Sequence, residues 1–386
     1  MTAPTYYKSL DGFRALAVLM VVMIHSRWLP IGWIGVQMFF VLSGFLITGI
    51  LIAQKQNKFS NYIGHFYWKR SLRIWPLYFL FISFIGIICI RFHVEGGYNF
   101  KNCWIEIISY TYNLIRIFPQ NESSWFGHLW TLCIEEQFYL VWPFVIYFLT
   151  IQKLRRFVVM LIIIGPLARL VTGSVAGSIF DTPEQVQRAV HNMTTSHIDA
   201  FACGAFLSLI PTHWRIRFSA KSRYIFFSMA AVTIICGFTN SCCLAYQNFP
   251  PHWQALGYDN MRYLHQYVWG YTLLNLTSAS LIFCLIEKRF LTSLFEHPIA
   301  VYLGTISYGI YIWHIPLLRI LFAHWPAEPH SAEGVLRFFA LLALTVLTAS
   351  VSFFCFERFF LRMKKYNFND VLIILSKAVQ PTKRNN

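Results

Sequence analysis

An arginine and a histidine lie eleven residues apart in the apolar stretch SLDGFRALAVLMVVMIHS, which covers residues 9–26. On a helix, eleven residues rise roughly 16 Å and turn through almost a whole number of turns, so Arg14 and His25 share one face at different depths. A guanidinium group binds phosphates bidentately, and a histidine can act as a general base or accept an acyl group. The spacing therefore predicts a site that a long, thin substrate bridges.

Other apolar segments also carry polar residues, namely Ser43 in FFVLSGF, Glu135 and Glu136 in HLWTLCIEEQFYLVWP, Asp199 in SHIDAFACGAF and His314 in SYGIYIWHIPL. Ionisable groups at membrane depth are costly and usually functional. These positions fall in one outer-to-middle layer, so we expect them to face a common cavity. Two structural alternatives stay open, because Asp199 could cap a helix and Ser43 could belong to a small-residue packing contact.

A second group of charges lies at the opposite end of the predicted site. In YWKRSLRIWPLY, the cations Lys69, Arg70 and Arg73 are close in depth to Arg14, and Asp11 precedes Arg14 by three residues, a spacing that allows an ion pair. These cations could simply anchor the helix end by reaching the lipid headgroups. A ligand with phosphates at one end and a reactive group on a long arm, such as acyl-CoA, would fit both ends.

The composition predicts that membrane helices position these residues. Of the 386 residues, 56% are hydrophobic and only 12% are charged, whereas charged residues make up about a quarter of a soluble domain. We therefore expect an all-α integral membrane protein, a bundle of about ten transmembrane helices. The expected spans are 12–28, 33–53, 73–91, 128–150, 156–174, 196–211, 224–246, 267–286, 300–322 and 335–357.

The formal charge of +16 is explained by topology rather than by nucleic-acid binding. Twenty-two lysines and arginines fall on one side of the predicted alternation of loops, and the opposite loops hold only Lys101, Arg116, Arg188 and Arg262. By the positive-inside rule, both termini are predicted to be cytoplasmic. No nucleic-acid partner is expected.

The chain is predicted to be one membrane domain, residues 1–358, followed by a basic cytoplasmic tail, 359–386, with no fused soluble domain. Residues 103–118 are expected to form an interfacial or re-entrant helix, since an eleventh span would invert the later loops. The nine cysteines show no metal-ligand spacing, so no metal is expected. A disulfide among Cys103, Cys242 and Cys243 is left open.

These segments resemble the acyltransferase-3 family of membrane O-acyltransferases, which modify bacterial surface sugars and related acceptors. The most specific match is the family's Arg/Lys-x10-His signature, present here as Arg14 and His25. It is accompanied, in order, by FFVLSGFLI at 39–47, RSLRIWPLY at 70–78, HLWTLCIEEQFYL at 128–140, SHIDAFACGAF, and LGTISYGIYIWHIPL at 303–317.

The resemblance implies transfer of an acyl group, usually acetyl, from cytoplasmic acetyl-CoA to a hydroxyl of a carbohydrate at or beyond the outer face of the bacterial inner membrane. Examples of such an acceptor are lipopolysaccharide O-antigen and other envelope glycans, free or lipid-linked. It implies His25 as the catalytic residue, with Glu136 or Glu135 orienting His25 or the acceptor hydroxyl. Expected donor-binding residues are Arg14, Arg70, Arg73, Asp11 and Lys69. Expected to line or support the acceptor cavity are Ser43, Tyr139, His314, Asp199 and Trp130.

Two other functions stay open at this stage. A transporter could use intramembrane histidine and carboxylates as a proton relay, although the sequence shows no evident inverted repeat and no paired Gly/Pro-interrupted helices. An inactive membrane scaffold is the other possibility. The acyl group could pass directly from donor to acceptor, or through an acylated His25, Ser43 or Tyr139.

Overall fold

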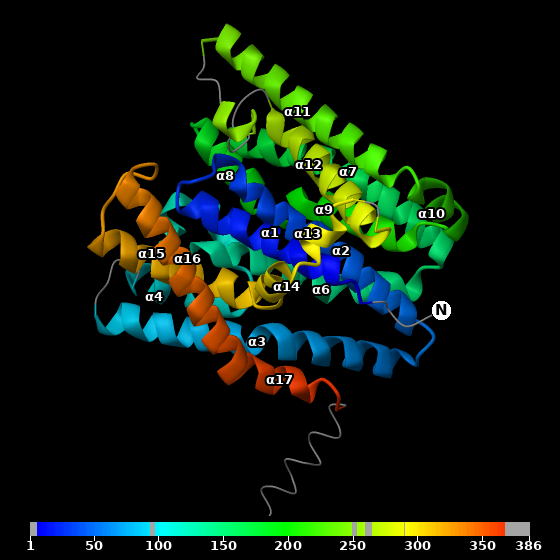
Figure 1. Ribbon diagram of the computed structural model, residues 1–386, viewed down its shortest axis with the longest axis horizontal. Coiled ribbons are helices and arrows are strands. Elements are labelled where there is room, and N and C mark those ends of the chain that lie inside the picture. Colours follow the sequence, from blue (N-terminus) through cyan, green and yellow to red (C-terminus); the bar gives the residue numbers. More distant parts are fainter. Residues whose placement is uncertain (1–5, 93–96, 249–252, 259–264, 289, 367–386) are drawn as a thin grey trace, which may run out of the picture.

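The computed structural model describes residues 6–92, 97–248, 253–258, 265–288 and 290–366, which form helices and contain no strand (Figure 1). The longer helices are α1 (Lys8–His25), α2 (Ile34–Gln54), α3 (Phe59–Arg91), α6 (Trp130–Phe148), α7 (Ile151–Gly177), α9 (Ile198–Leu209), α11 (Ser222–Tyr246), α12 (Gln266–Ile286), α15 (Ser307–His324) and α16 (Ala332–Ser352). The shorter ones are α4 (Gly97–Ile108), α5 (Tyr112–Ile115), α8 (Pro183–Asn192), α10 (Thr212–Ser219), α13 (Thr292–Phe295), α14 (Pro298–Thr305) and α17 (Arg358–Met363).

Short turns of tighter or wider helix join these elements. The 3₁₀ turns are η1 (Pro30–Trp33), η2 (Pro119–Asn121), η3 (Gly127–Leu129), η4 (Thr194–His197) and η5 (Trp253–Ala255). The π-helical turn η6 (Phe353–Glu357) joins α16 to α17.

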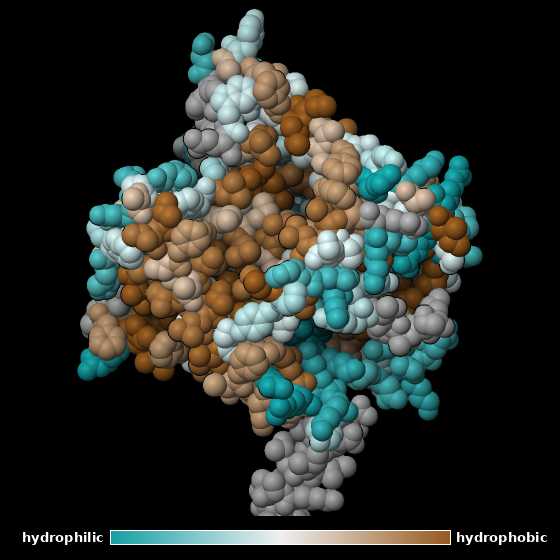
Figure 2. Space-filling view, viewed as in Figure 1, coloured by the Kyte–Doolittle hydropathy of each residue, from teal (hydrophilic) through white to brown (hydrophobic). Residues whose placement is uncertain are grey.

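Several helices are long and apolar enough to cross a membrane. Six segments of the described chain meet this condition: Pro30–Gln54, Phe59–Arg91, Ile151–Gly177, Ser222–Tyr246, Gln266–Ile286 and Ala332–Met363. A bent pair, α14 with α15, would make a seventh if it counts as one span. Figure 2 shows a broad hydrophobic area between two hydrophilic ends. The chain is therefore a multi-pass membrane protein, whereas the number of ten spans stays a prediction.

Helix α3 begins at residue 59, fourteen residues before the predicted start of the third span at 73. The earlier segment is helical because its aromatic side chains are buried: Tyr62 and Phe66 pack in the core, and the Tyr62 hydroxyl donates to the Pro143 carbonyl at 3.0 Å. Arg70 and Arg73 therefore lie within a continuous helix that extends well before the predicted span, whose boundary at residue 73 stays a prediction.

The predicted span 300–322 is two helices, α14 and α15, which meet at 71° around Ile306. Gly304 explains the closeness of this junction to α1, because a Cβ there would lie only 1.8 Å from the Asp11 carbonyl oxygen. The bend turns Ser307, Tyr308 and Tyr311 of α15 into the interior of the bundle. A single straight span would not place these side chains there.

The segment predicted as one interfacial helix, 103–118, is divided between α4 and α5. Tyr110 interrupts it with a left-handed backbone (φ 57°), a conformation common just after a helix C-terminus. The Tyr110 ring stacks on Tyr78 at 4.4 Å between centroids, which holds the break against α3. All nine cysteines are free, so the disulfide left open for Cys103 does not form.

Helices α2 and α9 approach each other through two glycines. A Cβ on Gly44 would lie 2.0 Å from the Phe201 carbonyl oxygen, and one on Gly204 would lie 1.8 Å from that of Val41. The small-residue contact is thus made by Gly44 rather than by Ser43. Because neighbouring helix positions point in different directions, Ser43 is free to face α6.

Candidate active site

A cavity lies in the bundle between α1, α2, α3, α6 and α15. Three arginines line it, Arg14, Arg70 and Arg73, all of them among the expected donor-binding residues. Arg14 forms the expected ion pair with Asp11, and the Tyr6 hydroxyl also donates to that carboxylate. The cavity thus presents three guanidinium groups, of which one is held by a buried carboxylate.

The middle of the cavity holds a hydrogen-bonded group made of Ser43, Glu135 and Tyr139. Both hydroxyls donate to Oε1 of Glu135, and the two hydroxyl oxygens are 3.2 Å apart. The Arg70 guanidinium lies 5.7 Å from the centroid of the Tyr139 ring, which links this group to the cationic end. Glu135 is therefore placed to hold or accept a hydroxyl proton inside the cavity.

Two hydroxyl groups that line the cavity, those of Thr131 and Tyr311, are hydrogen-bonded to each other. The Tyr311 hydroxyl donates to the His128 carbonyl at 2.6 Å. The Tyr311 backbone carbonyl lies 2.6 Å from Nδ1 of His314, the ring partner of His25. Tyr311 therefore lines the cavity and also contacts the two histidines.

His25 is paired with another histidine rather than with a carboxylate. Its Nδ1 lies 3.0 Å from Nε2 of His314, a fully buried side chain. A carbonyl oxygen can only accept, so Nδ1 of His314 carries the hydrogen that bonds to the Tyr311 carbonyl. In neutral His314, Nε2 then has the lone pair and Nδ1 of His25 donates to it. Neutral His25, whose side chain is exposed, consequently has its free lone pair on Nε2.

A third histidine, His128, completes this group and was not identified from the sequence. Its ring centroid lies 5.3 Å from that of His314, and its Nε2 lies 3.2 Å from the Ile312 carbonyl. His128 opens the segment HLWTLCIEEQFYL, and its position at the outer end of that segment was the available signal. Only the fold shows that it lies beside His314, because 186 residues separate the two in the sequence.

Glu136 and Trp130 lie away from the histidine group. Oε2 of Glu136 accepts a hydrogen bond from the Trp75 indole at 3.2 Å, so the contact that the structure records for it is with α3 and not with His25. Trp130 packs on His191, with ring centroids 4.3 Å apart, and lies 5.6 Å from His197. Lys69 lies on α3 beside the cavity residue Arg70, but does not itself line the cavity.

Asp199 forms a fully buried ion pair with Arg169 of α7. Two parallel hydrogen bonds of 2.9 Å join the guanidinium to the carboxylate, and the Thr272 hydroxyl donates to the same carboxylate at 2.6 Å. Both charged side chains are completely shielded from solvent. Arg169 was missed in the sequence, although an arginine inside a predicted span is itself a signal.

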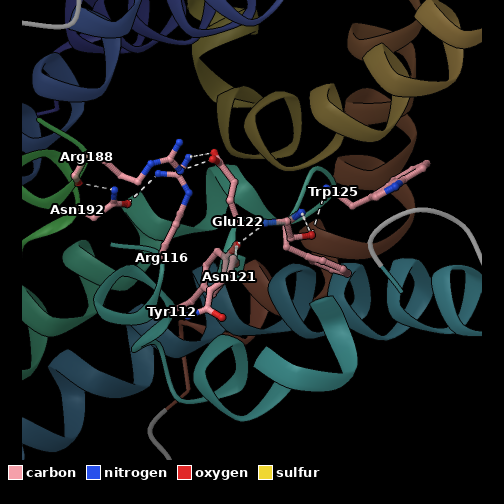
Figure 3. Close-up of polar contacts among 9 residues, drawn as sticks. Tyr112, Arg116, Asn121, Glu122, Trp125, Arg188 and Asn192 are labelled. Carbon is pink, nitrogen blue, oxygen red and sulfur yellow. Dashed lines mark hydrogen bonds and ion pairs between the residues drawn. The ribbon is translucent and has the colours of Figure 1, made fainter. Parts of the chain in front are cut away.

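An outer ion-pair cluster, consisting of Arg116, Glu122 and Arg188, joins the loop after α5 to α8 (Figure 3). Arg116 donates to Oε1 of Glu122 at 2.7 Å and to Oδ1 of Asn192 at 2.8 Å, and Arg188 donates to the other oxygen of Glu122. Burial alone would raise the pKa of Glu122, but the two arginines outweigh it and hold that pKa below its usual value.

This cluster lies next to the histidine group. A Cβ on Gly127 would be 3.9 Å from Nε of Arg116, and His128 is the following residue. The cluster thus lies beside the residue that precedes His128. Within the described residues, no group of three or more His, Cys, Asp or Glu side chains is arranged to hold a metal ion.

Comparison with known proteins identifies the type of domain. The family model described as an acyltransferase domain (Acyl_transf_3) matches residues 7–356. The chain is 29% identical over 363 residues to the peptidoglycan O-acetyltransferase OatA of Listeria monocytogenes, an alignment that covers 90% of this chain and 54% of the relative. It is 29% identical over 331 residues to the putative peptidoglycan O-acetyltransferase YrhL of Bacillus subtilis, covering 81% and 49%.

A more distant relative is the putative O-acetyltransferase SACOL0978 of Staphylococcus aureus, which is 23% identical over 359 residues, covering 90% of this chain and 56% of the relative. The chain spans about half the length of the curated relatives it matches. No solved structure matches the chain.

Proposed function

Because the chain belongs to the acyltransferase-3 family and is an acyltransferase, we propose that it transfers an acetyl group from cytoplasmic acetyl-CoA to a hydroxyl of a bacterial envelope carbohydrate. The acceptor lies at the outer face of the inner membrane, with both chain termini on the cytoplasmic side. Two relatives are named for peptidoglycan, which makes peptidoglycan the first acceptor to test and lipopolysaccharide O-antigen the second.

One observation carries this proposal: a single cavity is lined by Arg14, Arg70 and Arg73 and also by Tyr311. The Tyr311 carbonyl accepts a hydrogen bond from His314, which is the partner of His25. Guanidinium groups bind phosphates through charge-assisted hydrogen bonds, so the cationic end suits the phosphates of CoA. The pantetheine arm then extends along the cavity. Arg14 and His25 are separated by roughly 16 Å along α1, a distance that a long thin arm can cover.

The chemistry proceeds at Nε2 of His25. Its lone pair accepts the proton of the acceptor hydroxyl while the hydroxyl oxygen attacks the thioester carbonyl. The new bond joins that oxygen to the acetyl carbon, the carbon–sulfur bond breaks, and the CoA thiolate takes the proton back from His25. His314 holds the imidazole in the tautomer with the lone pair on Nε2.

We assign the Ser43–Glu135–Tyr139 group to the passage of the thioester rather than to a covalent intermediate, because direct transfer needs one step. For the acetyl group to reach His25 from the cavity, the Tyr311 hydroxyl must move away from Thr131. The hydrogen bond between these two hydroxyls must therefore break before the thioester can pass Tyr311.

The test uses the purified protein with acetyl-CoA labelled on the acetyl group. Wild type, His25→Ala and the control His324→Ala, a change at an exposed histidine of α15, are incubated with peptidoglycan fragments or with lipopolysaccharide. CoA release and labelled glycan that depend on His25 but not on His324 support the proposal. Label retained on the protein itself, and lost in Ser43→Ala or Tyr139→Phe, would replace direct transfer with a covalent route. Undiminished transfer by His25→Ala would refute the mechanism.

A further inference from the structure

The end of the last helix reaches the cationic end of the cavity. Helix α17 packs against α3 and lies beside its N-terminal half in Figure 1. The Trp68 indole donates a hydrogen bond of 3.0 Å to the Tyr366 carbonyl, which fixes the chain just after α17 to the turn of α3 that precedes Lys69 and Arg70. Lys364, two residues before Tyr366, is thereby brought to the cationic group.

Lys364 experiences the charges of four other cations, which are Arg73, Arg70, Lys69 and Arg14. It follows directly after the membrane-length segment Ala332–Met363, and its side chain is partly buried. Burial, and then repulsion by these four cations, lowers the pKa of Lys364 from 10.5 to about 7. Close to neutral pH, therefore, this amine changes its charge readily.

The negative charge available to this group is small. Among the described residues, only Arg14 of the five cations has a carboxylate within ion-pair distance, that of Asp11. Up to residue 366, where the described chain ends, the other ionisable groups of the turn η6, α17 and the residues after it are Cys355, Glu357, Arg358, Arg362, Lys365 and Tyr366. Of these, Glu357 is the one carboxylate; it is buried and accepts from Ser352 at 3.1 Å. The carboxylates of Glu135 and Glu136 also act on Arg70, and that of Glu357 acts on Arg73. The five cations from three segments therefore keep a net positive charge, which favours a polyanion.

Building on the proposed donor, we propose that Lys364 is a fifth cationic group of the donor site, which binds a phosphate of the thioester nucleotide and takes up a proton when it does so. Arg14, Arg70 and Arg73 line the cavity, whereas Lys364 lies outside the cavity lining. Lys364 extends the donor site beyond the three arginines, away from the histidines, where the pyrophosphate and the 3′-phosphate of CoA would lie.

The proton uptake has a defined pH window. At pH 8, about nine-tenths of an amine whose pKa is about 7 is neutral, and a bound phosphate would return it to the charged form. The phosphate monoester itself titrates near pH 6, so it is already doubly charged at pH 8 and takes up no proton there. Uptake should therefore be large at pH 8 and vanish toward pH 5.5, where Lys364 is charged before the ligand binds.

The experiment is titration calorimetry of the full chain with acetyl-CoA at pH 8 and pH 5.5, in buffers of different ionisation enthalpy. Wild type should take up close to one proton at pH 8. Lys364→Gln should bind about tenfold more weakly and take up none. Lys364→Arg keeps its charge and should bind well without uptake. Lys365→Gln, which removes the neighbouring exposed lysine, is the matched control and should behave as wild type.

The outcomes separate the two proposals. If wild type binds acetyl-CoA and Lys364→Gln matches it in affinity and proton uptake, the role of Lys364 is refuted and the proposed donor stands. If wild type binds no acetyl-CoA, both are refuted. An anionic lipid headgroup offers the same phosphate chemistry, so the titration is run in nanodiscs of phosphatidylcholine with and without phosphatidylglycerol. Uptake confined to the discs that contain phosphatidylglycerol would assign the phosphate to a lipid and overturn the assignment to the donor.

Discussion

Nδ1 of His25 lies 3.0 Å from Nε2 of His314, and His314 in turn hydrogen-bonds through Nδ1 to the Tyr311 carbonyl at 2.6 Å. This relay of two neutral imidazoles determines which nitrogen of His25 keeps a free lone pair. The Tyr311 side chain lines the cavity from the other side. The same residue thus couples the donor cavity to the tautomer of His25.

Replacing His314 should impair the chemical step and leave donor binding intact. In His314→Ala, His25 loses the acceptor for its Nδ1 hydrogen, so its Nε2 no longer holds the lone pair in a fixed direction. Positioned general-base catalysis contributes roughly 10²–10⁴-fold, and we expect kcat to fall by about 10²-fold with little change in the KM for acetyl-CoA. Initial rates at several pH values test this, with His324→Ala as the control. A raised KM at unchanged kcat would contradict the positioning role.

Removing either of the two α3 arginines that line the cavity should weaken the binding of acetyl-CoA. Arg70→Ala and Arg73→Ala each remove charge-assisted hydrogen bonds, worth about 1.5–3 kcal/mol, or roughly ten- to a hundredfold in affinity. Lys58→Ala, an exposed cation just before the same helix, should have no effect. Calorimetric titration with acetyl-CoA measures all three variants. Equal affinities throughout would place the phosphates elsewhere.

Breaking the buried pair between Arg169 and Asp199 should destabilise the fold more than it alters catalysis. Asp199→Ala leaves a fully buried guanidinium without its carboxylate, which costs about 3–5 kcal/mol. The double variant with Arg169→Met removes both charges and should recover part of the loss. Thermal unfolding in detergent compares them with Asp181→Ala, a change at an exposed carboxylate. A single variant as stable as wild type would show that the pair is dispensable.

The outer ion-pair cluster should hold its loop at neutral pH and release it in acid. The pKa of Glu122 is lowered in the folded protein, so its contribution to stability is complete above the unfolded value of about 4.3 and is lost as the pH falls through the folded value. Glu122→Gln should release the loop at neutral pH. Hydrogen exchange over residues 112–125 and 183–192 should then accelerate several-fold, with Glu328→Gln unchanged. Equal exchange rates in wild type and Glu122→Gln would show that the ion-pair cluster does not hold the loop.

The local sequence pattern was sufficient to predict part of the candidate site. Arg14 and His25 are on one helix, so a period of 3.6 residues places them on one face without knowledge of the fold. The same reasoning paired Asp11 with Arg14, and the cationic character of 69–73 follows from composition alone. The all-helical membrane class follows from hydropathy, and the family from motifs in their order along the chain.

Partners that are distant in the sequence could not be predicted in this way. The sequence suggested a carboxylate for His25, whereas the structure supplies His314, and it grouped Glu135 with Glu136 although adjacent helix residues point about 100° apart. Glu135 consequently faces Ser43, and Glu136 faces Trp75. The burial of Asp199 against Arg169 likewise depends on how α7 packs on α9.

The sequence by itself determined that this chain is a helical membrane protein with a cation and a histidine at the two ends of one helix face, because those features depend on local composition and helical period. Its motifs also indicated the acyltransferase-3 family. The tertiary structure alone decided that α14 and α15 meet at a bend around Ile306, that Tyr311 lines the cavity, and that His314 holds the tautomer of His25. These relationships arise where side chains from separate helices meet, and close packing between backbones, such as that of Gly304 on Asp11, sets them.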